Sequence, residues 1–75
     1  MKLVDVESGQ KVHIIDIQGG RGVGAKLRKL SLMPGDCITV LKRAPLRGPI
    51  LVENNDRSVA LGRGVAAMVE VEPCE

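Results

Sequence analysis

Hydrophobic and polar residues alternate over five short stretches of the chain, as they do in β-strands that bury one face. In the first stretch, Val12, Ile14 and Asp16 share one face, while His13 and Ile15 lie on the other. β-Branched residues are frequent in these stretches, and turn-forming residues separate them. We predict strands over residues 11–18, 37–43, 50–53, 58–61 and 69–72.

A helical spacing follows the first predicted strand. Val23, Leu27 and Leu30 are separated by four and three residues, which places them on one face of a helix, while the basic residues between them point away. The sequence therefore predicts one two-turn helix between residues 22 and 32.

Turn-forming residues mark the connections between these elements. Pro34 and Gly35 suit the two central positions of a type II turn, which ends the helix. The segment 44–49 contains two prolines and is predicted to form a rigid basic loop. Residues 54–57 predict the turn of a hairpin, and residues 65–68 predict a single helical turn.

Five short strands and one helix in 75 residues close best as a small barrel, because closure hides strand edges that promote aggregation. The chain is too short for a second domain. The predicted fold class is mainly β: a single domain, residues 1–75, folded as a small SH3-like, partly open barrel of about five strands with one short α-helix.

The composition narrows the possible functions. Hydrophobic residues make up 44% of the chain, which is enough for one small core and not for a deep enclosed substrate pocket. Phe, Trp and Tyr are absent, which excludes aromatic platforms for single-stranded bases and aromatic grooves for proline-rich peptides. We therefore expect a binding or regulatory protein without catalytic residues.

Basic residues are concentrated in the middle of the chain. The net charge is +2, yet residues 21–47 contain seven basic residues and one acidic residue. This distribution is consistent with a positive face that meets an acidic partner or phosphates, and equally with a solvated helix surface.

The glycine-rich segment 19–24 precedes the predicted helix, as phosphate-binding loops do. A Walker motif needs lysine directly after the last glycine and then serine or threonine, whereas Ala25, Lys26 and Leu27 follow here. We interpret the segment as a turn and not as a nucleotide site.

His13, Cys37 and Cys74 are the candidate metal ligands. They are single residues in separate segments, and neither cysteine belongs to a Cys-x-x-Cys pair, so local spacing prepares no site. We expect no metal site, no cofactor and no tight binding of Fe²⁺ or Zn²⁺. Two cysteines, no signal peptide and no long apolar run favour a reducing compartment, the cytoplasm.

Several motifs together resemble the FeoA family, small cytoplasmic SH3-like proteins that accompany the ferrous-iron transporter FeoB. The most specific motif is RAPLRGP at residues 43–49. The others are the two glycines at 19–20, LRKLSLMPG at 27–35 and VALGR at 59–63. The resemblance covers nearly the whole chain, although Ser31 stands where the family usually has glycine.

The resemblance implies an accessory or regulatory protein of ferrous iron uptake that contacts the cytoplasmic part of a FeoB-type transporter. It implies no catalytic residues, no nucleic acid and no direct insertion into a membrane. Residues from the turns and the helix are predicted to maintain the fold: Gly19, Gly20, Leu27, Leu30, Pro34, Gly35, Pro45, Gly48 and Pro49.

We predict the partner-binding surface at the helix end and the proline-flanked loop, because these segments combine rigidity, basic charge and apolar groups. Arginine suits such a surface, since its planar guanidinium pairs with carboxylates while its stem covers apolar groups. The apolar candidates could instead pack on the barrel. The predicted residues are Arg28, Leu32, Met33, Arg43, Leu46 and Arg47.

Two alternatives remain open from the sequence. A KOW-like RNA-binding or ribosome-binding barrel would account for residues 9–26 but leaves the Pro-Gly turn and the proline-flanked loop unexplained. The chain also resembles the C-terminal module of iron-dependent repressors, in a form that no DNA-binding helices precede.

Overall fold

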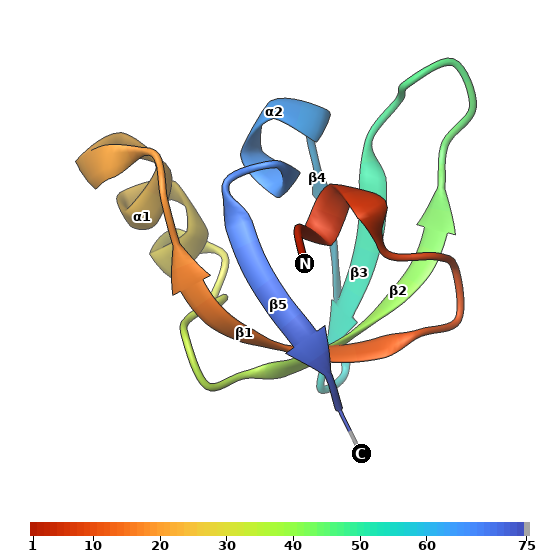
Figure 1. The fold of residues 1–75 in the computed structure, drawn as a ribbon, viewed down its shortest axis with the longest axis horizontal. Helices are drawn as coiled ribbons and strands as arrows, with labels where there is room; N and C mark the ends of the chain where they lie inside the picture. The colour runs from red at the N-terminus through yellow and green to blue at the C-terminus, as the bar shows by residue number, and fades with distance from the viewer. Residues whose placement is uncertain (75) are drawn as a thin grey trace.

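The computed structural model describes residues 1–74. Its strands form one antiparallel sheet in the order β4-β3-β2-β1-β5. Figure 1 shows this sheet curling into a partly open barrel. The predicted mainly β fold of five strands is therefore confirmed. The strands are β1 Lys11–Ile17, β2 Cys37–Arg43, β3 Ile50–Asn54, β4 Arg57–Leu61 and β5 Val69–Pro73.

The alternation in the sequence places one face of each strand in a single core. Val12 and Ile14 of β1 and Ile38 and Val40 of β2 are at most 1% exposed. The other strands contribute in the same way, and Leu3 of the short 3₁₀ helix η1, Leu3–Asp5, completes the core. Every side chain in this core is hydrophobic.

The predicted helix is present as α1, Gly20–Lys29, and a short helix α2, Arg63–Ala66, precedes β5. α1 begins at Gly20 and ends at Lys29, whereas the predicted range is 22–32. Gly22 and Gly24 lie inside the helix, while Gly20, with a φ of 82°, is its first residue. Each interior glycine costs about 1 kcal/mol relative to alanine. Packing offsets this cost, since Leu27 is fully buried.

A Schellman motif ends α1. The Leu32 amide donates to the Leu27 carbonyl at 2.9 Å, and the Ser31 amide donates to the Arg28 carbonyl at 3.0 Å. Ser31 has a φ of 63°, the left-handed conformation that this motif requires and that glycine adopts most readily. The motif turns Leu32 back into the core beside Leu27.

We expect Ser31→Gly to raise the free energy of unfolding by about 0.5–1 kcal/mol, because glycine removes the cost of the left-handed conformation. Loss of the contact between Arg57 Nη1 and Ser31 Oγ, 3.3 Å long and exposed, should offset little of this gain. Urea unfolding followed by far-UV circular dichroism measures the change. Ser58→Gly, at an exposed strand position, should destabilise instead.

The turn after α1 is also as predicted. Gly35 has a φ of 98°, and the Asp36 amide donates to the Met33 carbonyl at 3.0 Å, as in a type II turn. The Asp36 side chain accepts a second hydrogen bond from the Met33 amide. This turn directs the chain from the helix into β2.

The loop between β2 and β3, residues 44–49, is closed by its own backbone. The Ala44 amide donates to the Pro49 carbonyl at 3.0 Å, and the Gly48 amide donates to the Pro45 carbonyl at 3.1 Å. A Cβ atom at Gly48 would lie 2.7 Å from Ala44 Cβ and 3.1 Å from Pro45 O. The loop therefore leaves no space for a side chain at this position.

We expect Gly48→Ala to lower the free energy of unfolding by about 1–3 kcal/mol, because Ala44 Cβ is fixed to the backbone and cannot rotate away. Gly64→Ala is the control, since a Cβ atom there meets nothing within 4 Å. Thermal unfolding of both variants compares the two sites. Equal melting temperatures would mean that the loop relaxes without cost.

The first residues cover part of the outer edge of β5. The Val71 amide donates to the Met1 carbonyl at 2.7 Å, and Lys2 forms an isolated bridge with Glu70. The terminal ammonium of Met1 also donates to the Glu70 carboxylate, which lowers the pKa of Glu70. The end of β5 beyond Val71 is held by β1 alone among these backbone contacts.

Candidate partner-binding site

An open groove runs along one side of α1, between the helix and the end of β1. It consists of two adjoining cavities of about 570 Å³ and 230 Å³ that share Ile17, Gly24 and Arg28. We call it the α1 groove. The larger cavity is also lined by Gly20, Arg21 and Ala25, and the smaller one by Asp16, Leu32, Met33 and Pro34.

The groove exists because α1 has small residues on this side. Gly20, Gly24 and Ala25 follow the helical spacing and present almost no side chain to it. A Cβ atom at Gly20 or Gly24 would meet nothing within 4 Å. The space beside these glycines is therefore open to solvent, and no other part of the domain packs closely against them.

The groove is flanked by positive charge. Arg21 and Arg28 line it, and Lys26 and Lys29 lie on the same helix but do not line the groove. None of the ion pairs formed within residues 1–74 involves a cation of α1. Asp16 contributes one carboxylate to the smaller cavity. The groove thus offers an apolar floor with arginines whose charge an acidic partner could match.

Three of the predicted partner-binding residues lie in or beside this groove. Arg28 lines both cavities, and Met33, which is 49% exposed, lines the smaller one. Leu32 also forms part of its wall but is only 1% exposed, so of the two possibilities left open for the apolar candidates, Leu32 packs on the barrel. The Schellman motif is the reason, because it directs Leu32 toward the core.

The other three predicted residues lie elsewhere. The loop that carries Leu46 and Arg47 lies at the opposite end of the molecule from α1 (Figure 1). Leu46 is 99% exposed, whereas Arg43 is half-buried and donates from Nη2 to the Val4 carbonyl at 2.9 Å. Arg43 therefore fastens β2 to η1, and the six predicted residues do not form one continuous surface.

Most of the other groove residues are not assigned to a partner-binding surface from the sequence, among them Ile17, Arg21 and Gly24. The spacing of Gly20 and Gly24 was a usable signal, since two glycines four residues apart lie on one helix face. This signal competes with the preference of glycine for turns, which the same residues also indicate.

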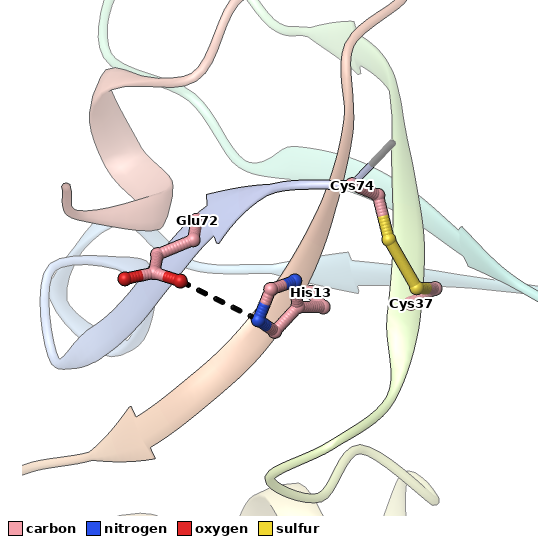
Figure 2. Close-up of a disulfide and its surroundings, with 4 residues drawn as sticks. All are labelled: His13, Cys37, Glu72 and Cys74. Atoms are coloured by element: carbon pink, nitrogen blue, oxygen red, sulfur yellow. Dashed lines mark ion pairs between the residues drawn. A yellow bond between two sulfur atoms is a disulfide. The ribbon is translucent and has the colours of Figure 1, made fainter.

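The structure also contains a disulfide that the sequence analysis does not predict. Cys37 and Cys74 form a disulfide, with their Cα atoms 6.7 Å apart. Local spacing could not indicate this pair, because 37 residues separate the two cysteines and the sheet order brings them together. His13 lies beside them, with Nε2 3.6 Å from Glu72 Oε2 (Figure 2).

With the two cysteines joined, residues 1–74 contain no group of three or more His, Cys, Asp or Glu side chains placed to hold a metal ion. Within the same residues, no helix is long and apolar enough to cross a membrane.

Comparison with known proteins adds a family. The sequence profile of the FeoA domain matches residues 1–73. The Fe(2+) transport protein A/Fe(2+) transporter FeoB fusion protein of Porphyromonas gingivalis is 37% identical over 73 residues. This match covers 96% of the present chain and 8% of the fusion protein. The chain thus spans a small part of that relative.

Solved structures agree with this match. A crystal structure of the iron uptake regulatory protein FeoA has a TM-score of 0.89 and 31% identity, over 99% of this chain and 96% of the other. The solution structure of FeoA from Chlorobium tepidum has a TM-score of 0.90 and 28% identity, over 100% and 71%. The manganese regulator SloR, with a TM-score of 0.89, is 16% identical over 99% of this chain and 34% of the other, which shows a shared fold alone.

Proposed function

The chain belongs to the FeoA family, and we propose on this premise that it is a non-catalytic accessory protein of ferrous iron uptake. It acts in the cytoplasm by contact with the cytoplasmic part of a FeoB-type transporter. The Porphyromonas gingivalis relative supports this partner, because there a related segment and a FeoB transporter are parts of one polypeptide. A covalent link of this kind keeps two contacting domains at high local concentration.

We place the contact at the α1 groove. The observation that carries this proposal is the open, glycine-lined floor of the groove beside Arg21 and Arg28. A partner side chain can enter the space above Gly20 and Gly24 without moving the helix. Arginines at the rim of such a floor suit carboxylates, and Met33 adds an adaptable apolar contact.

The matching surface on the transporter is an acidic segment with at least one apolar side chain. Its carboxylates would pair with Arg21 and Arg28, and its apolar side chain would cover Ile17. Complementary charge of this kind mainly raises the rate of association, so binding should weaken as the salt concentration rises. The FeoA match over residues 1–73 favours this function over the RNA-binding alternative.

A substitution that fills the groove tests the proposal. We expect Gly24→Leu to weaken binding to the cytoplasmic part of a FeoB-type transporter by about tenfold or more, which corresponds to about 1.4 kcal/mol. The folded domain should not suffer, because the new side chain projects into open space and leucine favours a helix over glycine. Isothermal titration calorimetry measures the affinity, and thermal unfolding measures the stability.

Gly22→Leu is the matched control. Gly22 lies in the same helix, also has nothing within 4 Å of a Cβ atom, and does not line the groove. It should bind as the unmodified protein does. Equal affinity of both variants would place the contact elsewhere on the domain. No binding by the unmodified protein at low salt would contradict the proposed partner itself.

A further inference from the structure

The disulfide joins the two strands that flank β1. Cys37 is the first residue of β2 and lies opposite His13 of β1. Cys74 follows β5 on the other side of β1, and its amide donates to the Lys11 carbonyl at 2.9 Å. Figure 2 shows the bond reaching from Cys74 to Cys37 beside the β1 ribbon. The bond therefore links elements that the sheet has already brought together.

Backbone hydrogen bonds hold both cysteines in place without the sulfur atoms. The register pairs His13 with Cys37 on one side of β1 and Val12 with Pro73 on the other. With the disulfide open, these contacts keep the two thiols within reach of each other. The bond then re-forms within one molecule. The backbone contacts raise the effective concentration of one thiol near the other, which makes this step fast.

The disulfide lies outside the core and is accessible. Cys37 is exposed and Cys74 is half-buried, whereas the buried side chains of the core include neither of them. Opening the bond removes no core contact, so the sheet and its core can persist in the reduced protein, although with lower stability. Because Cys37 is an exposed residue, a thiolate in solution can approach the bond from this side, and such access is the condition for thiol–disulfide exchange.

Basic groups stand on the same part of the sheet. His13 is the register partner of Cys37, and Lys11 contacts Cys74 through its backbone. The Glu72 carboxylate, 3.6 Å from His13 Nε2, opposes the histidine, whereas Lys11 belongs to none of the ion pairs found within residues 1–74.

We propose that Cys37 and Cys74 are a reversible dithiol–disulfide couple that exchanges with small thiols and disulfides of the glutathione class and controls how firmly the end of β5 is held. In the oxidising direction, the Cys37 thiolate attacks the small disulfide, which releases one small thiol and leaves a mixed disulfide on Cys37. The Cys74 thiolate then attacks the Cys37 sulfur and releases the second small thiol. The protons of the two cysteines end on the released thiols, and the two electrons reduce the small disulfide.

The end of β5 is the part of the structure that reduction of the disulfide should change. Beyond Val71, the backbone contacts that β5 makes within residues 1–74 are all with β1, and Val12 and Pro73 form the last register pair. The disulfide is the second attachment of this end. Reduction should therefore loosen residues 72–74 while the core contacts of Val69 and Val71 remain. This inference does not depend on the partner or on the α1 groove.

The test equilibrates the protein in glutathione buffers of graded ratio, blocks free thiols by alkylation and weighs the products by mass spectrometry. We expect one transition, at which both thiols disappear together with the loss of two hydrogen atoms, and little mixed disulfide. Reoxidation should proceed at a rate independent of protein concentration. Hydrogen exchange of the Cys74 amide should be several-fold faster in the reduced protein, while the Ile14 amide stays protected.

The single variant Cys37→Ser is the matched control. It keeps only the Cys74 thiol, so it cannot close a bond within the domain. It should accumulate mixed disulfides in the buffers that close the bond in the unmodified protein. Mixed disulfides or covalent dimers as the main product of the unmodified protein would overturn the proposal. So would loss of the native circular dichroism of the reduced protein at low temperature, because the bond would then be a requirement for folding.

Discussion

Replacing Leu27 with alanine is expected to lower the free energy of unfolding by about 2–5 kcal/mol, because the lost side chain leaves a cavity in the core. Leu27 is fully buried and is the residue of α1 that packs most deeply into the core. The loss of stability in Leu27→Ala should exceed the loss expected from the smaller side-chain volume alone. Three of the ten residues of α1 are glycine, so the helix depends on this packing and not on its intrinsic propensity.

Urea unfolding of the Leu27→Ala protein measures the stability, and the helical signal of far-UV circular dichroism reports on α1 under native conditions. Leu41→Ala is the control for loss of the same side chain at a position that is 40% exposed, where the cost should stay below about 1 kcal/mol. If both variants lose equal stability, α1 does not depend on Leu27 for its place on the sheet.

Removal of the disulfide is expected to lower the free energy of unfolding by about 3–4 kcal/mol. The bond spans 37 residues, and a cross-link of that span restricts the unfolded chain strongly in the chain-entropy account. For a domain of this size the change corresponds to a fall in melting temperature of about 15–25 °C. The double variant Cys37→Ser with Cys74→Ser and the reduced unmodified protein should agree, because neither cysteine belongs to the core.

Chemical unfolding of the oxidised protein, the reduced protein and the double serine variant compares the three states directly. The urea dependence should also be steeper without the bond, since the unfolded chain then exposes more surface. A loss of less than about 1 kcal/mol would mean that the unfolded chain is already compact without the cross-link.

Local pattern predicted the strands well. β2 has the predicted bounds, because Ile38 and Val40 alternate with polar positions and a proline-containing loop follows. At the start of α1, by contrast, the local pattern and the structure disagree. Glycine disfavours a helix locally, and the packing of Leu27 that overcomes this cost is a tertiary contact that the sequence does not display.

The candidate site could be predicted only in part. Arg28 and Met33 follow from charge and from their place near the helix end, and both line the α1 groove. The burial of Leu32 depends on the left-handed conformation of Ser31, which serine adopts less readily than glycine and which is therefore hard to foresee. The disulfide depends on strand order, which no local spacing expresses.

The position of β1 between β2 and β5 sets a constraint on biosynthesis. β1 begins at Lys11, but its second neighbour is formed by Val69–Pro73, more than fifty residues later in the chain. A nascent chain that has reached β4 therefore has one edge of β1 open, with Val12 and Ile14 incompletely covered. Pairing of this kind, distant in sequence, is slow to form. The domain can complete its folding only after translation of β5, and until then the open edge of β1 is the part of the molecule most exposed to aggregation.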